Sequence, residues 1–182
     1  IGMLNVIYAE NLMNWSLLAS ATIMELVQSF DDHYSTPLNE VKHHYGQNLV
    51  ANALQATLKD SKLVKSREEH HYNQKVEVDV LVEKMQEYYS IRCVPQIVGP
   101  IVDTVNYAKE VLINEINSAN DNPIVDWERK NVYHGGNFHG DYISLEMDKL
   151  KIVITKLTML AERQLNYLLN IFVAVDNLID HY

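Results

Sequence analysis

Apolar side chains recur every three or four residues over long parts of the chain, the spacing of a helix with one apolar face. The clearest case is 141–182, which contains neither glycine nor proline. Its stripe consists of Ile143, Met147, Leu150, Ile154, Leu157, Ala161, Leu165, Leu168, Phe172, Val175 and Ile179. A continuous helix over this stretch would span roughly 60 Å at about 1.5 Å per residue. That length is typical of a bundle of long helices or an oligomer core.

Further stretches with the same spacing predict helices over 4–30, 47–59 and 97–116. In the first, the stripe is formed by Leu4, Tyr8, Leu12, Trp15, Ala19, Ile23, Leu26 and Phe30. We expect these stripes to face a core and not a cofactor. The predicted fold class is therefore all-α.

The segments between the helices carry other signals. The turn at 117–123 is rich in Asn, Asp and Ser, whose side chains bond their own backbone. The apolar residues of 124–125 and 131–133 predict a short hairpin, and 61–74 predicts a charged, irregular connection. We find no internal repeat, and the length fits a single domain.

Composition narrows the class of partner. The 182 residues include 24 acidic and 15 basic side chains, a net charge of −9, which argues against a nucleic-acid partner. One cysteine, Cys93, excludes an internal disulfide and suits a reduced cytoplasmic protein. No apolar run reaches membrane-spanning length, and the first residues lack the features of a signal peptide. We expect a cytoplasmic protein with neither a nucleic-acid nor a membrane partner.

The most informative polar stretch is 86–96. Tyr89 stands three residues before Arg92, and Gln86 three residues before Tyr89, so a helical backbone would place all three on one face. A permanent cation beside a phenol favours the phenolate, which makes Tyr89 a plausible base. A guanidinium also holds a carboxylate in a bidentate manner. The trio suits a site that acts on an amino acid, although such a pair is more often a surface pair.

Histidines could instead suggest a metal site. His43 and His44 are adjacent in sequence, as are His70 and His71, and adjacent side chains point in different directions. The pair at 134 and 139 flanks a Gly-Gly turn without a recognised ligand spacing. We predict surface and loop histidines and no metal.

Three blocks together resemble the aromatic amino acid ammonia-lyase family, which includes histidine, phenylalanine and tyrosine ammonia-lyases and related aminomutases. They are the Gln-Glu-Tyr-Tyr-Ser-Ile-Arg-Cys-Val-Pro-Gln of 86–96, the Asn-rich turn of 117–123, and the Gly-Gly-Asn-Phe-His-Gly of 135–140. Their order and spacing also match. The resemblance implies a fumarase/aspartase-like bundle of long helices and a homotetramer.

The resemblance also implies a reaction and roles for single residues. Members of the family eliminate ammonia from an α-amino acid and leave an α,β-unsaturated acid. Tyr89 matches the catalytic tyrosine that takes the β-proton, and Arg92 matches the arginine that binds the substrate carboxylate. Gln86 and Asn137 match residues near the substrate, and Phe138 an aromatic beside the electrophile. We expect the two loops that carry Tyr89 and Phe138 to lie at one end of the long helices.

The family's electrophile is a methylidene-imidazolone made from an internal Ala-Ser-Gly, and no Ala-Ser-Gly occurs in these 182 residues. We therefore expect a central piece of a longer enzyme, inactive alone. Residues 1–170 would form its central helical segment. Residues 171–182 resemble a helix from a later part of such enzymes, which would place a junction at Asn170–Ile171.

Several alternatives remain open at this point. The loop at 134–142 looks closest to bacterial tyrosine ammonia-lyases, but histidine and phenylalanine stay possible substrates. An aminomutase would use the same scaffold. A non-catalytic helical assembly module would also keep it, and an Ala-Ser-Gly in the complete gene separates that module from an enzyme.

Overall fold

A computed structural model describes the backbone of residues 1–72 and 85–179, and the side chains of residues 1–72 and 85–170. The secondary-structure elements of its described part are helices apart from one small hairpin, so the all-α prediction is confirmed. The helical elements are α1 (Gly2–Leu26), η1 (Asp32–Tyr34), α2 (Thr36–Glu40), α3 (Tyr45–Leu58), η2 (Glu68–Tyr72), α4 (Tyr89–Arg92), α5 (Val94–Ile116) and α6 (Asp141–Ile179).

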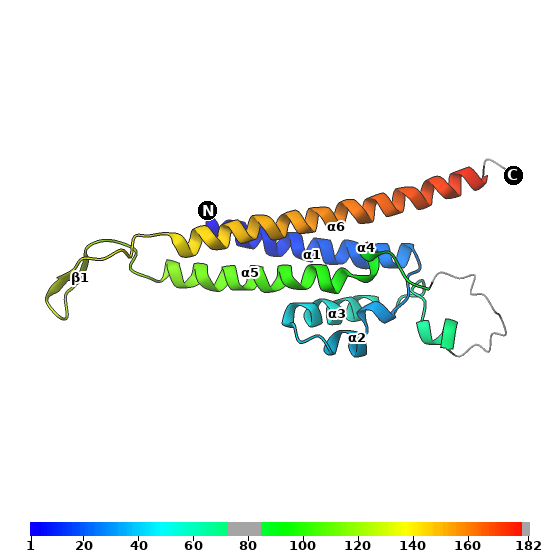
Figure 1. Cartoon of the computed structure of the whole chain (residues 1–182), viewed down its shortest axis with the longest axis horizontal. Helices are drawn as coiled ribbons and strands as arrows, with labels where there is room; N and C mark the ends of the chain where they lie inside the picture. The colour runs from blue at the N-terminus through cyan, green and yellow to red at the C-terminus, as the bar shows by residue number, and fades with distance from the viewer. Residues whose placement is uncertain (73–84, 180–182) are drawn as a thin grey trace.

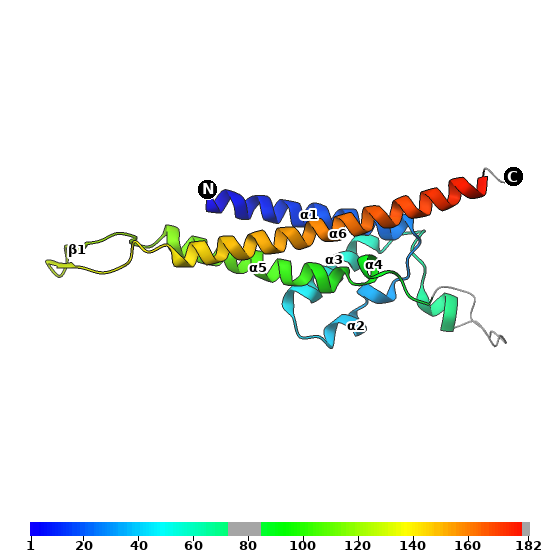
Figure 2. The same cartoon turned by 45° about the horizontal axis from the view of Figure 1, so that its top comes forward.

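Helix α5 is the centre of the fold. It packs against α1, α3 and α6, and Figures 1 and 2 show these long helices side by side along one axis. The apolar residues of α5 in the core are almost completely buried: Val94, Val98, Ile101, Val102, Val105, Ala108 and Leu112. An apolar face this broad is what a central helix needs.

The predicted boundaries hold within a few residues. The helix expected over 97–116 begins at Val94, because Pro95 suits a first helical turn and Cys93 already lies outside the helix. The helix expected over 47–59 is α3. The predicted hairpin is confirmed as β1 (Ile124–Asp126) paired antiparallel with β2 (Asn131–Tyr133). The connection expected over 61–74 includes the turn η2, and its residues 73–74 lie outside the described part.

The apolar stripe predicted for the first helix is wrong as a core face. Leu4, Tyr8 and Trp15 are 54%, 65% and 68% exposed, whereas Val6 and Met24 are fully buried. Because α1 carries apolar residues on nearly every side, helical spacing can be traced along several of its faces. Only the positions of α5 and α6 decide which face is buried. The other face leaves a row of large apolar side chains uncovered in a single copy.

Helix α6 runs from Asp141 to Ile179 without interruption. Its predicted stripe is buried at Leu150 and Leu157, while Leu165 is 58% exposed. The stripe positions beyond residue 170, and residues 180–182, lie outside the described side chains or backbone. The backbone marks no boundary at Asn170–Ile171, and the division of the chain at that point stays a prediction.

The N-terminus of α3 touches α5 at a pair of glycines. A Cβ added to Gly46 would lie 2.1 Å from the carbonyl oxygen of Gly99, and one added to Gly99 would lie 2.6 Å from the backbone nitrogen of Gln47. Beside this contact the buried Gln47 amide donates to Asn39 Oδ1 at 3.0 Å. Because glycine has no side chain, Gly46 and Gly99 allow the backbones of α3 and α5 to come into direct contact near the N-terminal end of α5.

A compact polar corner follows α1. The Arg67 backbone N–H donates to Asp31 Oδ1 at 2.9 Å, and its guanidinium pairs with Asp32 at 3.2 Å. The same guanidinium lies 3.7 Å from the centre of the Phe30 ring. His33 is buried in this corner at 5% exposure, and neither of its ring nitrogens has a hydrogen-bond partner among the described residues. Burial lowers the pKa of His33 to about 4, with Asp32 opposing the shift and Arg67 adding to it.

Lowering the pH should destabilise the fold, because His33 in this polar corner would have to be protonated while buried. Between pH 6.5 and 4 the unfolded chain binds a proton on this imidazole and the folded chain does not. Stability contributed by the neutral ring is therefore present above pH 6.5 and lost as pH falls, by about 3 kcal/mol. Denaturant unfolding at several pH values should show that the free energy of unfolding decreases less with falling pH in His33→Leu than in the unchanged chain. His44→Gln, at an exposed position, should follow the unchanged chain, and identical profiles for all three would contradict the prediction.

None of the helices in the described ranges combines enough length with enough apolar character to cross a membrane.

Candidate functional site

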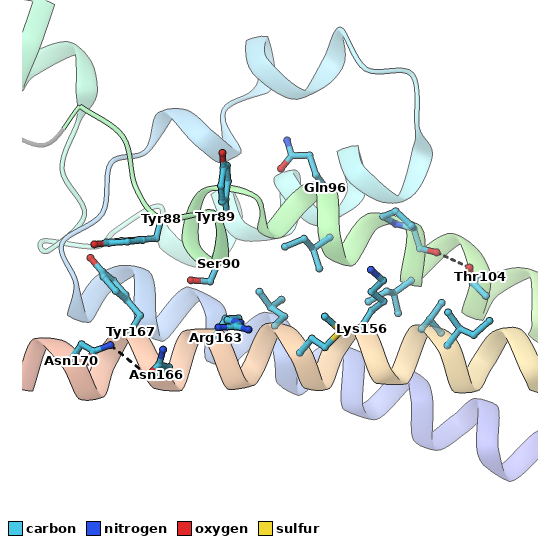
Figure 3. A pocket seen from close by; sticks show the side chains of 17 residues that line it. Tyr88, Tyr89, Ser90, Gln96, Thr104, Lys156, Arg163, Asn166, Tyr167 and Asn170 are labelled. Atoms are coloured by element: carbon cyan, nitrogen blue, oxygen red, sulfur yellow. Dashed lines mark hydrogen bonds between the residues drawn. The ribbon is translucent and has the colours of Figure 1, made fainter.

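A groove of about 970 Å³ runs between α6 on one side and α4 with the first half of α5 on the other. Its floor is apolar, formed by Ile97, Ile101, Val153 and Leu160. Polar side chains stand along its length, and Figure 3 shows the following ones from both sides of the groove: Tyr88, Tyr89, Ser90, Gln96, Thr104, Lys156, Arg163, Asn166, Tyr167 and Asn170. An apolar trough with a few polar groups is a common form of binding site.

The structure brings Tyr89, Arg92 and Gln86 together. The Arg92 guanidinium carbon lies 4.8 Å from the centre of the Tyr89 ring, and Arg92 Nη1 donates to Gln86 Oε1. The reason differs from the sequence prediction. Helix α4 begins at Tyr89, and Tyr88 before it has an extended backbone, so Gln86 is not on a helical face with the others. The chain bends back instead and brings the Gln86 amide to Arg92.

Tyr89 is the member of this trio that borders the groove. Its side chain is 71% exposed, and Figure 3 shows its hydroxyl pointing away from α6. Arg92 is half-buried, and its Nε is buried without an acceptor in the part of the chain described. The trio thus places the solvent-accessible phenol of Tyr89 beside the guanidinium of Arg92, which is half-buried and bonded to Gln86. Its catalytic and binding roles remain predictions.

Asn137 and Phe138 do not join this site within one chain. They lie in the loop between β2 and α6, and Phe138 is 61% exposed. The 23 residues of α5 separate this loop from α4, a span of roughly 35 Å at about 1.5 Å per residue. The expectation that both loops lie at one end of the helices is wrong, because α5 joins them as a single rod and places them at opposite ends (Figure 1).

The α6 residues along the groove were missed by the sequence analysis. Lys156, Arg163, Asn166 and Tyr167 fall between the apolar positions of the stripe, and their spacing alone is that of a solvated helix face. A usable signal was the pair Lys156 and Arg163, two cations two turns apart on an otherwise acidic chain. They add positive charge to a groove whose other rim carries Tyr89.

Metal ligation has no support from the described side chains. No group of three or more His, Cys, Asp and Glu residues among them could hold a metal ion.

Comparisons with known proteins agree over most of the chain. A family model described as "Aromatic amino acid lyase" matches residues 1–179. Tyrosine 2,3-aminomutase of Myxococcus sp. (strain Mx-B0) is 33% identical over 171 residues, which cover 89% of this chain and 32% of that protein. Histidine ammonia-lyase of Caenorhabditis elegans is 33% identical over 162 residues, 89% of this chain and 23% of the relative.

Solved structures show the same likeness. Phenylalanine aminomutase of Pantoea agglomerans superposes with a TM-score of 0.83 at 33% identity, over 91% of this chain and 33% of that one. The chain thus spans about a third of the length of this structure and of the Myxococcus relative.

Proposed function

Because the chain belongs to the aromatic amino acid lyase family, we propose that it is part of an enzyme that removes ammonia from an aromatic amino acid, tyrosine or histidine. The product is the α,β-unsaturated acid. The observation that carries the proposal is the cluster of Tyr89, Arg92 and Gln86, which places a candidate base beside a carboxylate-binding cation. The activity is that of the complete enzyme, of which these residues supply one part.

Arg92 would bind the substrate carboxylate. A guanidinium carries five N–H donors in a planar fork, and the contact with Gln86 uses one of them. The Gln86 amide and the Tyr89 ring limit how the guanidinium can turn. Carboxylate binding at Arg92 would therefore fix the substrate's Cα and Cβ relative to the neighbouring phenol.

Tyr89 would take the β-proton. In the elimination the Cβ–H electron pair becomes the Cα–Cβ double bond, the Cα–N bond breaks, and the nitrogen leaves as ammonia. The phenolate oxygen of Tyr89 accepts the proton. Its 71% exposure in a single copy leaves room for a substrate above the ring.

The family generally uses a methylidene-imidazolone, an electrophile that makes the amino group a better leaving group. The Ala-Ser-Gly from which it forms is absent from the 182 residues, so this chain does not fit the role of carrying the group. What its own residues contribute is carboxylate binding and proton transfer.

An aminomutase is the second candidate, favoured by the names of two relatives, tyrosine 2,3-aminomutase and phenylalanine aminomutase. The first half of its reaction would use Tyr89 and Arg92 in the same way. A non-catalytic assembly module that keeps the same scaffold is the third candidate, and the presence of an Ala-Ser-Gly in the complete gene would separate the enzyme from it.

Product analysis of the complete enzyme separates these candidates. Tyrosine, histidine and phenylalanine are each incubated with it, and products are identified by chromatography and mass spectrometry. An unsaturated acid with released ammonia supports the lyase, and a β-amino acid supports the aminomutase. Unchanged substrates in all three reactions would overturn the proposed function and leave the assembly module.

We also propose that the enzyme is a homo-oligomer, a tetramer by the family resemblance, in which the two loops meet between copies. Large apolar side chains on α1 remain uncovered in a single copy, with Leu12 at 45% and Trp15 at 68% exposure. Tyr89 and Phe138 lie at opposite ends of α5. An antiparallel arrangement of two copies would place the Tyr89 end of one beside the Phe138 end of the other.

Mixed oligomers test this arrangement. Tyr89→Phe and Phe138→Ala enzymes, each inactive or weak alone, are co-expressed with different affinity tags, and oligomers carrying both tags are purified. If the site takes one loop from each of two copies, about a quarter of the sites in a random mixture combine two unaltered loops. Activity should recover to about that fraction. No recovery above the separate variants would contradict a site shared between copies.

A further inference from the structure

A buried amide on α6 is bonded to the turn that carries Tyr89. Gln164 is 2% exposed, and its side-chain nitrogen donates to Ser20 Oγ of α1 at 2.9 Å. The same nitrogen donates to the backbone carbonyl of Ser90 in α4 at 3.0 Å. One NH₂ group therefore joins three helices that are far apart in sequence.

Helix α4 depends on outside contacts for its position. It is a single turn of four residues, Tyr89–Arg92, and an isolated turn of this length is not stable in water. Ile91, fully buried, fixes the turn on its apolar side. Gln164 provides a polar contact on a different side, at Ser90, which lies directly after Tyr89 and two residues before Arg92.

The geometry of this contact makes it sensitive to substitution. Gln164 has two N–H donors on one nitrogen, and the two acceptors lie on different helices. Ser20 is also fully buried, so water cannot readily replace the amide. Without this donor, the buried Ser20 hydroxyl and the Ser90 carbonyl would lose a hydrogen-bond partner. Leaving a buried polar group unpaired costs more free energy than forming the bond contributes. The turn would then be held by Ile91, by the packing of Tyr88 on Tyr167 and by its continuation into α5, none of which replaces the polar contact at Ser90.

We propose that Gln164 is a positioning residue: its amide sets the placement of α4, and through it the placement of both the Tyr89 phenol and the Arg92 guanidinium. The proposal deepens the proposed function and rests on it for the catalytic consequence. Gln164 touches neither the phenol nor a substrate. A displacement of about 1 Å at a reacting group can lower the rate by about 100-fold.

The test uses the complete enzyme with Gln164→Met, which keeps the length and volume of the side chain but cannot donate. Ser20→Ala removes only one of the two acceptors. Leu150→Ala is the matched control, because Leu150 is also buried on α6 and far from α4. The amides of Ile91, Arg92 and Cys93 donate within this turn at 2.9 Å each, so hydrogen exchange in 86–93 reports on α4 without any catalysis.

In Gln164→Met we expect the α4 amides to exchange about tenfold faster relative to those of α5. We expect kcat/KM to fall about 100-fold, with a lower kcat and a higher KM, since both functional groups move. Ser20→Ala should show a smaller change in the same direction. Leu150→Ala should change α4 and α5 exchange together and leave KM unaltered, as a smaller folded fraction would.

Unchanged relative exchange in α4 of Gln164→Met, or an unaltered KM with kcat within twofold of the original enzyme, would overturn the proposal. If the original enzyme converted no amino acid, the proposed function would fail instead. The exchange comparison would still decide on its own whether Gln164 holds α4.

Discussion

Replacing Tyr89 with phenylalanine in the complete enzyme should lower kcat by about 10²–10⁴-fold, the contribution of a positioned general base. The ring and its contact with the Arg92 guanidinium, 4.8 Å from the ring centre, would remain. Only the hydroxyl is lost, so KM should change little. Steady-state formation of the unsaturated acid, followed by its ultraviolet absorbance, measures both constants.

Two comparisons make this result specific. Tyr88→Phe removes a neighbouring phenol, whose ring packs 4.8 Å from that of Tyr167, and should keep most turnover. Arg92→Lys should mainly raise KM, because an ammonium cannot reproduce the planar two-point grip on a carboxylate. A Tyr89→Phe enzyme with near-normal kcat would mean that another group takes the proton.

Gly46→Ala should destabilise the fold by about 3 kcal/mol or more, at the upper end of what overpacking costs. The new methyl would lie 2.1 Å from the Gly99 carbonyl oxygen and 2.8 Å from Asp103 Oδ1. The first of these is backbone in the middle of the core, so the clash can be relieved only by moving α3 away from α5. Chemical denaturation monitored by circular dichroism gives the change in the free energy of unfolding.

Gly136→Ala is the matched control. Nothing lies within 4 Å of a Cβ added there, so its unfolding midpoint should stay close to that of the unchanged chain. Gly46→Ala with an unaltered midpoint would show that the close contact between α3 and α5 does not persist in solution.

Much of the fold was predictable because its signals are local. The apolar spacing of α5 and the Asn-rich turn after Ile116 predict the end of this helix at the observed residue and its start to within three residues. The buried face of α1 was not predictable in the same way. Val6 and Trp15 are both apolar, and only the contacts of α1 with α5 and α6, which depend on tertiary structure, bury the first and leave the second exposed.

The candidate site also contains residues that local sequence predicts and residues that only tertiary packing brings into place. Tyr89, Arg92 and Gln86 lie within seven residues, so their proximity followed from sequence even though the backbone path was predicted wrongly. The Lys156 and Arg163 side of the groove comes from another helix, and periodicity marks it only as polar surface. Gln164 likewise gave no signal, since a glutamine among apolar residues acquires its role only from what packs against it.

The packing of α1 against α6 also has a consequence for synthesis on the ribosome. The bond between Ser20 and Gln164 joins residues 144 positions apart, and the ion pair of Glu10 with Lys109 spans 99. At about 5–20 residues per second, α1 is synthesised roughly seven to thirty seconds before its partner residues in α6. Until α3, α5 and then α6 have been synthesised, part of the future core face of α1 stays exposed together with its Trp15 face. The nascent chain therefore carries an exposed apolar helix until its packing partners in α5 and α6 have been synthesised.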